Sequence, residues 1–252
     1  IFNAGVGTLA PGIGYGFENG DLVLGERNWL EGQDLASMAA MMGGWPLRFQ
    51  PGQHWLYPHG MDIAARLVEI MSGLPYDEYL RTAIFEPLGM VDTDFWVPAD
   101  KVDRFAANYG RNSRKELVLM DDPTKSAYLR KPKLFNGGGG LVGTTADYVR
   151  FVTMLASGGA VDGRRVLGRK TIELLATNHL EGDADMSALA LPMGYGEVGF
   201  EGNGFGLTVA VSKGPGPAGV VGTKGAVMWG GAPSGTFNFP GQLRALVYGA
   251  LL

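Results

Sequence analysis

The sequence contains, at residues 136–148, the segment NGGGGLVGTTADY, in which four consecutive glycines lead into a helix-like pattern. Three of its glycines match the spacing G-x-G-x-x-G of dinucleotide-binding loops. Such a loop follows a buried parallel strand, whereas residues 130–133 read RKPK, which a buried strand would not carry. The segment therefore favours a glycine turn that feeds a helix, with Thr144 or Thr145 as its N-cap.

Apolar residues at helical spacing predict further helices on both sides of this segment. They cover Asp34–Met42, Met61–Met71, Tyr76–Leu88 and Arg169–Thr177, and the helix after Thr144 is expected to end near Leu155. Short apolar runs between glycines predict strands at Gly206–Val211, Ala226–Trp229 and Gly235–Phe239. We expect an α+β fold: a mainly helical domain at 1–193, and at 194–252 the C-terminal part of an antiparallel sheet, incomplete in this chain, with a terminal helix.

Composition excludes several classes of function. Lysine and arginine number 21 against 25 acidic residues, a net charge of −4, so we expect no nucleic-acid partner. The chain has no cysteine, which excludes a disulfide scaffold and a thiolate nucleophile. No run approaches the roughly 18 apolar residues of a membrane helix. The chain starts at Ile1 without a signal-peptide pattern, so we expect a fragment or processed chain, with the cytoplasm as the favoured compartment.

Metal and cofactor sites are not expected. The chain has three scattered histidines, His54, His59 and His179, too few for a metal site without carboxylates brought in by the fold. Asp183 and Asp185 share a loop that lacks the glycine and glutamate of a calcium-binding loop, and we interpret it as a solvated acidic loop.

A nucleophilic serine is not evident. None of the eight serines lies in G-x-S-x-G, and none is followed by lysine three residues later.

Two segments remain as candidates for chemistry. Residues 51–60, PGQHWLYPHG, precede the predicted helix at Met61, whose positive dipole end would favour a phenolate at Tyr57; the alternative is an aromatic staple that packs the helix start. Trp229-Gly230-Gly231-Ala232 lies at a strand end, where two glycines allow close approach of a ligand to the backbone; the alternative is a plain bulge.

Four motifs in the same order resemble those of the serine β-lactamase-like hydrolases, and most closely the family VIII carboxylesterases, which are related to class C β-lactamases and D-alanyl-D-alanine peptidases. FQPGQHWLY at 49–57, followed by Asp62 and a helix, is similar to the family's F-x-P-G-x-x-W-x-Y-S. FEPLGM at 85–90 and the glycine segment at 136–148 resemble two further family motifs. WGG at 229–231 stands where lactamases carry K-T-G and esterases W-G-G.

The resemblance implies a serine hydrolase that acts on small carboxylic esters through an acyl-enzyme and needs no cofactor. It implies that Tyr57 is the general base and acid, and that the N–H of Ala232 and the serine's own N–H stabilise the oxyanion. The family's Ser-x-x-Lys segment would lie before residue 1, so this chain alone is expected to be inactive. A β-lactamase, a D-amino-acid peptidase, an acyltransferase and a non-catalytic binding protein are the alternatives.

Overall fold

The structure is a computed structural model that describes residues 15–18, 21–24, 32–45, 47, 49–55, 60–112, 114–189, 202–213 and 227–228. Its helices are α1 (Leu35–Gly43), α2 (Gly60–Ser72), α3 (Tyr76–Leu80), α4 (Glu86–Leu88), α5 (Thr145–Ala156), α6 (Arg169–Leu175) and α7 (Met186–Leu189). A π-helical turn at Arg81–Phe85 links α3 to α4, and 3₁₀ turns occur at Ala99–Arg104, Ala127–Leu129 and Glu181–Asp183.

The strands are short and all their pairings are antiparallel. They are β1 (Tyr15–Glu18), β2 (Asp21–Leu24), β3 (Asn108–Arg111), β4 (Leu117–Asp121), β5 (Ala160–Val161), β6 (Arg164–Arg165), β7 (Asn203–Phe205), β8 (Ala210–Ser212) and β9 (Val227–Met228). The first six form three hairpins, and the last three form a sheet in the order β7-β8-β9. The combination of helices with antiparallel sheet confirms the expected α+β fold class.

Helix starts and ends follow the signals in the sequence. The Asp34 side chain accepts a hydrogen bond from the N–H of Ser37, and the Ser37 hydroxyl accepts one from the N–H of Asp34, a reciprocal capping box at the start of α1. Thr144, one of the two predicted caps, accepts from the N–H of Asp147 at the start of α5. The helix predicted at 76–88 ends at Gly89, which has a left-handed φ of 66°.

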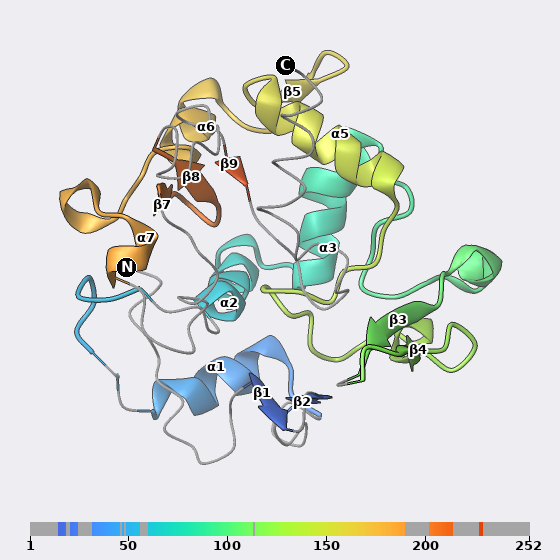
Figure 1. The fold of residues 1–252 in the computed structure, drawn as a ribbon. Coiled ribbons are helices and arrows are strands. Elements are labelled where there is room, and N and C mark those ends of the chain that lie inside the picture. Colours follow the sequence, from blue (N-terminus) through green and yellow to red (C-terminus); the bar gives the residue numbers. More distant parts are fainter. Residues whose placement is uncertain are drawn as a thin grey trace, which may run out of the picture.

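The helices pack around three apolar clusters. Figure 1 shows α2 near the middle of the described elements, and α1 packs against it through Leu35, Met38, Met42 and Ala65. The helical run from α3 to α4 lies beside α5, and both contribute to the largest cluster, made of Leu80, Phe85, Leu88, Met90, Phe95, Phe135 and Met154. The third cluster joins Trp55, Met186 and Ala210. Each fully buried leucine, methionine or phenylalanine side chain of these clusters contributes about 1.5–3 kcal/mol to the stability of the fold.

No individual strand is predicted before residue 194, whereas the structure has six there, β1 to β6. The hairpin β5–β6 turns at Asp162-Gly163, both with left-handed φ (49° and 76°), the Asp-Gly signal of a two-residue hairpin turn. The hairpin β3–β4 lies in the polar stretch after Lys101, and the side chains of Leu117 and Leu119 are exposed, so no buried face imposed a regular alternation on the sequence. The domain boundary between 193 and 194 falls outside the described residues and stays a prediction, as does the terminal helix.

Candidate functional site

The site residues expected from the sequence lie outside the described residues. These are Tyr57, Trp229, Gly230, Gly231 and Ala232. The structure does describe Trp55, two positions before Tyr57, and Met228, directly before Trp229. It also describes α2, which begins at Gly60. The geometry of the site is therefore built from these flanking residues.

Trp55, two positions before Tyr57, is anchored in the third apolar cluster. Its side chain is 1% exposed, and its backbone N–H donates to the carbonyl oxygen of Leu189 over 2.9 Å. The indole meets the Phe205 ring of β7 edge-on, with the ring centroids 5.4 Å apart. The chain leading to Tyr57 is thereby fixed against the sheet β7-β8-β9.

The chain leading to Trp229 joins the same sheet. Met228 pairs with Ala210 of β8, and Val227 pairs with Val211. Ala210 is 1% exposed and packs in the same cluster as Trp55. Ala210 thus relates the two flanks: it pairs with the strand that ends next to Trp229, and it lies in the same apolar cluster as Trp55.

On the other side of Tyr57, α2 is tied to the glycine segment by Asp62. The Asp62 side chain is 2% exposed, and its Oδ1 accepts the backbone N–H of Gly137 at 2.7 Å and that of Gly138 at 3.2 Å. Its place in the first turn also suits the positive end of the helix dipole. A Cβ on Gly137 would lie 2.1 Å from the carbonyl oxygen of Met61, so only glycine fits this contact.

The far end of the glycine segment is held by a second buried carboxylate. Asp147, in the first turn of α5, is 4% exposed. Its Oδ2 accepts the N–H of Asp92 at 2.7 Å and the hydroxyl of Thr93 at 2.8 Å. Asp94 and Val142 exchange two backbone hydrogen bonds, of 3.1 and 2.8 Å, which join residues 92–94 to the glycine segment.

These contacts support the structural interpretation of the glycine segment. A nucleotide-binding loop offers its backbone N–H groups to phosphate, whereas the N–H groups of Gly137 and Gly138 already donate to Asp62. The segment is a turn that packs against the start of α2 and leads into α5. Its amides at Gly137 and Gly138 are not free to bind an anion.

The pKa values of two side chains near the start of α2 and the glycine segment, Tyr76 and Asp94, are raised. Burial, and then the negative charge of Asp62, raises the pKa of the Tyr76 phenol. Burial also raises the pKa of Asp94, against the opposing effect of the hydrogen bond from the N–H of Phe95. The region around the start of α2 thus disfavours added negative charge on Tyr76.

The acidic side chains of the loop near residue 183 have hydrogen-bond or ion-pair partners. Asp183 accepts a 2.7 Å hydrogen bond from the Asn178 amide, and its carboxylate lies 3.8 Å from the Lys213 ammonium. Asp185 accepts from the N–H of Ser187 at the start of α7.

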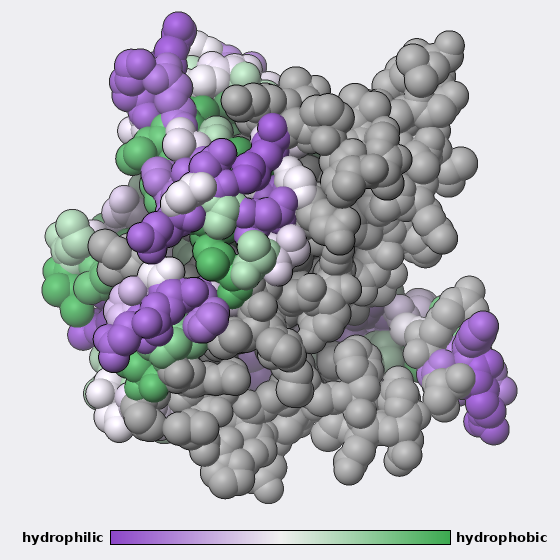
Figure 2. Space-filling model, turned by 60° about the vertical axis from the view of Figure 1, so that its left-hand side comes forward, coloured by the Kyte–Doolittle hydropathy of each residue, from purple (hydrophilic) through white to green (hydrophobic). Residues whose placement is uncertain are grey.

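Figure 2, turned so that the side carrying α7 comes forward, shows scattered hydrophilic groups with apolar areas between them. Within the part of the chain that the structure describes, no three potential ligand side chains gather as for a metal ion.

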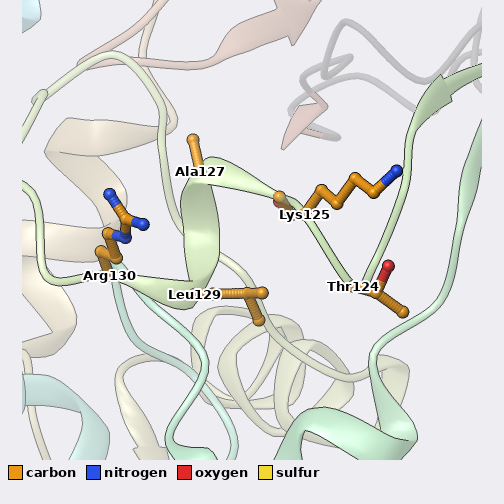
Figure 3. A pocket seen from close by; sticks show the side chains of 6 residues that line it. Thr124, Lys125, Ala127, Leu129 and Arg130 are labelled. Atoms are coloured by element: carbon orange, nitrogen blue, oxygen red, sulfur yellow. The ribbon is translucent and has the colours of Figure 1, made fainter.

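A pocket lies beside the 3₁₀ turn at Ala127–Leu129 (Figure 3). Thr124, Lys125, Ser126, Ala127, Leu129 and Arg130 line it. Lys125 and Arg130 lie on opposite sides of the turn, and Lys125 extends away from Arg130, so their two charges do not converge on one ligand. None of these residues was selected from the sequence, and we do not assign the chemistry to this pocket.

Among the described residues, every helix is too short or too polar to cross a lipid bilayer.

Sequence reasoning identified Asp62 only as part of a motif and did not assign it a role. A signal was present, because an aspartate in the first turn of an amphipathic helix is a common dipole partner. Its partner could not be identified, because Gly137 lies 75 positions away.

A family model described as Beta-lactamase matches residues 7–248 of the chain. Protein Rv1367c of Mycobacterium tuberculosis is 31% identical over 236 residues, which cover 93% of this chain and 55% of that protein. Lovastatin esterase of Penicillium rubens is 33% identical over 156 residues, 60% of this chain and 38% of the esterase.

The fold also matches that of solved structures. The LovD6 mutant of simvastatin synthase from Aspergillus terreus superposes with a TM-score of 0.63 at 28% identity, covering 75% of this chain and 48% of that one. The chain thus spans about half the length of these proteins. The resemblance to serine β-lactamase-like hydrolases is confirmed, and the chain belongs to the beta-lactamase family.

Proposed function

We propose that the protein carrying this chain hydrolyses small carboxylic esters through an acyl-enzyme, with Tyr57 as its general acid and base. The observation that carries the proposal is the position of Ala210, which packs with Trp55 and pairs with Met228. This shared cluster and strand pairing support a site to which the segments that follow, with Tyr57 and Trp229, both contribute. The similarity to a lovastatin esterase supports ester chemistry.

The reaction needs a nucleophile that this chain does not supply in the family's pattern. None of its serines has a lysine three residues later, and the chain covers 55% of its mycobacterial relative. We therefore place the Ser-x-x-Lys pair in a part of a longer protein beyond this chain. On a helix, residues three apart share a face, so the lysine amine can assist removal of the serine proton.

In the proposed cycle the serine oxygen attacks the ester carbonyl and its proton passes toward Tyr57. The oxyanion accepts hydrogen bonds from the N–H of Ala232 and from the serine's own N–H. The tetrahedral intermediate collapses, the C–O bond to the alcohol breaks, and the alcohol leaves with the proton from Tyr57. Water then attacks the acyl-enzyme, gives up a proton by the same route, and releases the acid and the serine.

Trp229 favours neutral esters over β-lactams in this proposal. A lysine at this position would offer a positive charge to a substrate carboxylate, whereas an indole offers apolar area and one N–H donor. Esters without a carboxylate lose nothing from the exchange.

An acyltransferase is the second candidate, favoured by the similarity to simvastatin synthase at 28% identity. The two functions share the acyl-enzyme and differ only in whether water or another alcohol accepts the acyl group.

The test compares the full-length protein with this chain alone on a short-chain chromogenic ester. We expect turnover and a covalent acyl adduct, seen by mass spectrometry, in the full-length protein, and neither in this chain alone. Added alcohol that diverts most of the acyl group into a new ester would identify a transferase. A full-length protein that forms no adduct with esters or penicillins would be a binding protein, and the proposal would be wrong.

A further inference from the structure

Asn136 and Gly137, at the start of the glycine segment, form an Asn-Gly pair. In such a pair the backbone nitrogen of the second residue can attack the side-chain amide carbon of the asparagine. Glycine favours this reaction because no side chain shields its nitrogen and its backbone adopts many conformations. The sequence thus places a chemically labile amide where the glycine segment meets the start of α2.

The reaction, deamidation, needs only water as co-reactant. The Gly137 nitrogen gives up its proton and forms a bond to Asn136 Cγ, the bond from Cγ to Nδ2 breaks, and the amide nitrogen leaves as ammonia. Water then opens the cyclic imide at one of its two carbonyl groups. The product at position 136 is an aspartate, or an isoaspartate with one more atom in the backbone.

The structure activates one partner in this reaction and restrains the other. Asn136 Oδ1 accepts the N–H of Gly138 at 2.8 Å, and a donor on this oxygen stabilises the negative charge that it gains when Cγ is attacked. The attacking nitrogen, that of Gly137, donates its N–H to Asp62 Oδ1 at 2.7 Å. Asp62 is 2% exposed, so water screens its charge little.

The Asp62 carboxylate opposes the attack. A carboxylate is too weak a base to take the proton from a peptide nitrogen, and hydrogen bonds to it are about twice as strong as neutral ones. Its negative charge also raises the energy of the negative charge that develops on the attacking nitrogen. We propose that Asn136 is a site of spontaneous deamidation, and that Asp62 suppresses the reaction in the folded chain by holding the N–H of Gly137.

Glycine is required at position 137, so a side chain cannot supply this protection. A side chain there would shield the nitrogen, but its Cβ would lie 2.1 Å from the carbonyl oxygen of Met61. The hydrogen bond to Asp62 restrains the nitrogen without adding any atom to this close approach.

Deamidation would weaken the contact between the glycine segment and α2. Asn136 Oδ1 and Asp62 Oδ1 accept the same N–H, that of Gly138, at 2.8 and 3.2 Å. A carboxylate at position 136 would therefore place two negative charges side by side, which is unfavourable in a buried position.

Asn203 and Gly204 provide a reference within the same molecule. Asn203 is 7% exposed, and both residues lie in β7, where they pair with residues of β8. A general opening of the fold should expose both Asn-Gly pairs, whereas removal of the Asp62 carboxylate acts on Asn136 alone.

The experiment follows deamidation in the full-length protein and its variants, incubated at mildly alkaline pH. Peptide mass spectrometry measures the conversion of amide to carboxyl at Asn136 and at Asn203, and circular dichroism checks that each variant is folded. Asp62→Ala should raise the rate at Asn136 about 10- to 100-fold, the rate equivalent of one hydrogen bond to a charged group. The rate at Asn203 should change by less than about 3-fold.

Asp147→Ala is the matched control variant. It removes another buried carboxylate from the first turn of a helix, whose partners are Asp92 and Thr93. A loss of stability alone acts on both Asn-Gly pairs, so this variant should change the rates at Asn136 and Asn203 by the same factor.

An unchanged rate at Asn136 in Asp62→Ala, or a rise matched at Asn203, would overturn the protective role. A slower rate would show that the carboxylate serves as a base for the reaction and would overturn it as well. If Asp62→Ala does not fold, Asp62→Asn takes its place, since it keeps an oxygen acceptor and removes the charge. It should raise the rate at Asn136 about 3- to 10-fold, and no rise there would overturn the inference. The measurement needs no catalytic activity, so its outcome is independent of the proposed function.

Discussion

Asp62 and Gly137 lie 75 positions apart in the sequence and are joined by a 2.7 Å hydrogen bond from the glycine N–H to the buried carboxylate. The contact fixes the start of α2 against the segment that leads to α5. It works only because residue 137 has no side chain: a Cβ there would lie 2.1 Å from the Met61 carbonyl oxygen and 2.9 Å from the Cβ of Ala65. This hydrogen bond, the longer one from the N–H of Gly138 and one close backbone approach together hold this junction.

Gly137→Ala should destabilise the fold. The added methyl would overlap the Met61 carbonyl oxygen, so the backbone must move, at a cost of about 1–3 kcal/mol. Urea unfolding of this chain, followed by circular dichroism, measures the change. Gly139→Ala is the matched control, because its Cβ meets only Asn136 Oδ1, at 4.0 Å. Equal unfolding midpoints for the two variants would show that the junction does not need glycine at 137.

Stability should fall as the pH rises past about 10, in part because of Tyr76. Its pKa is raised above the ordinary 10.0 in the folded chain by burial and by Asp62. The unfolded chain therefore loses this proton first, and the contribution of Tyr76, full below pH 10, is lost as the pH rises toward the folded-state pKa. Burial raises the pKa of Tyr128 as well, so it adds to the same loss.

The free energy of unfolding, measured at pH 7 and at about pH 10.5, checks this sign. Tyr76→Phe should show a smaller drop between the two pH values than the unsubstituted chain. An identical drop in both proteins would mean that Tyr76 ionises no less readily in the folded chain than in the unfolded one.

Trp229→Lys should shift substrate preference in the full-length protein. The new ammonium can pair with the carboxylate of a penicillin, and a neutral ester gains no such partner. The ratio of kcat/KM for penicillin to kcat/KM for ester should rise by about one to two decades, the size of one or two charge-assisted hydrogen bonds. A ratio that does not move would remove Trp229 from the substrate-binding role.

Much of the helical framework could be predicted from the sequence, because its signals are local. Asp34 and Ser37 cap α1 across three residues, Thr144 caps α5, and Gly89 ends the run of α3 to α4 with a left-handed φ. The π-helical turn at Arg81–Phe85 inside that run was not predicted, because an apolar spacing near 3.6 residues does not reveal one extra residue in a turn.

The junctions between elements could not be predicted from local patterns. Asp62 reaches Gly137, and Asp147 reaches Asp92 and Thr93, only after the chain has folded. A single sequence shows an acid in each helix's first turn and does not show which distant amide it meets. The same limit holds for Ala210, which shares an apolar cluster with Trp55 and pairs with Met228, and so links three segments far apart in the chain.

The most direct test of the account is kcat of the full-length protein and its Tyr57→Phe variant on a short-chain chromogenic ester, with circular dichroism to confirm that both are folded. Phenylalanine keeps the ring and removes only the oxygen that moves the proton. The account predicts that kcat falls by about 10² to 10⁴, the range for loss of a general acid and base. A variant that keeps nearly all of its kcat would contradict the account and return Tyr57 to a packing role at the start of α2.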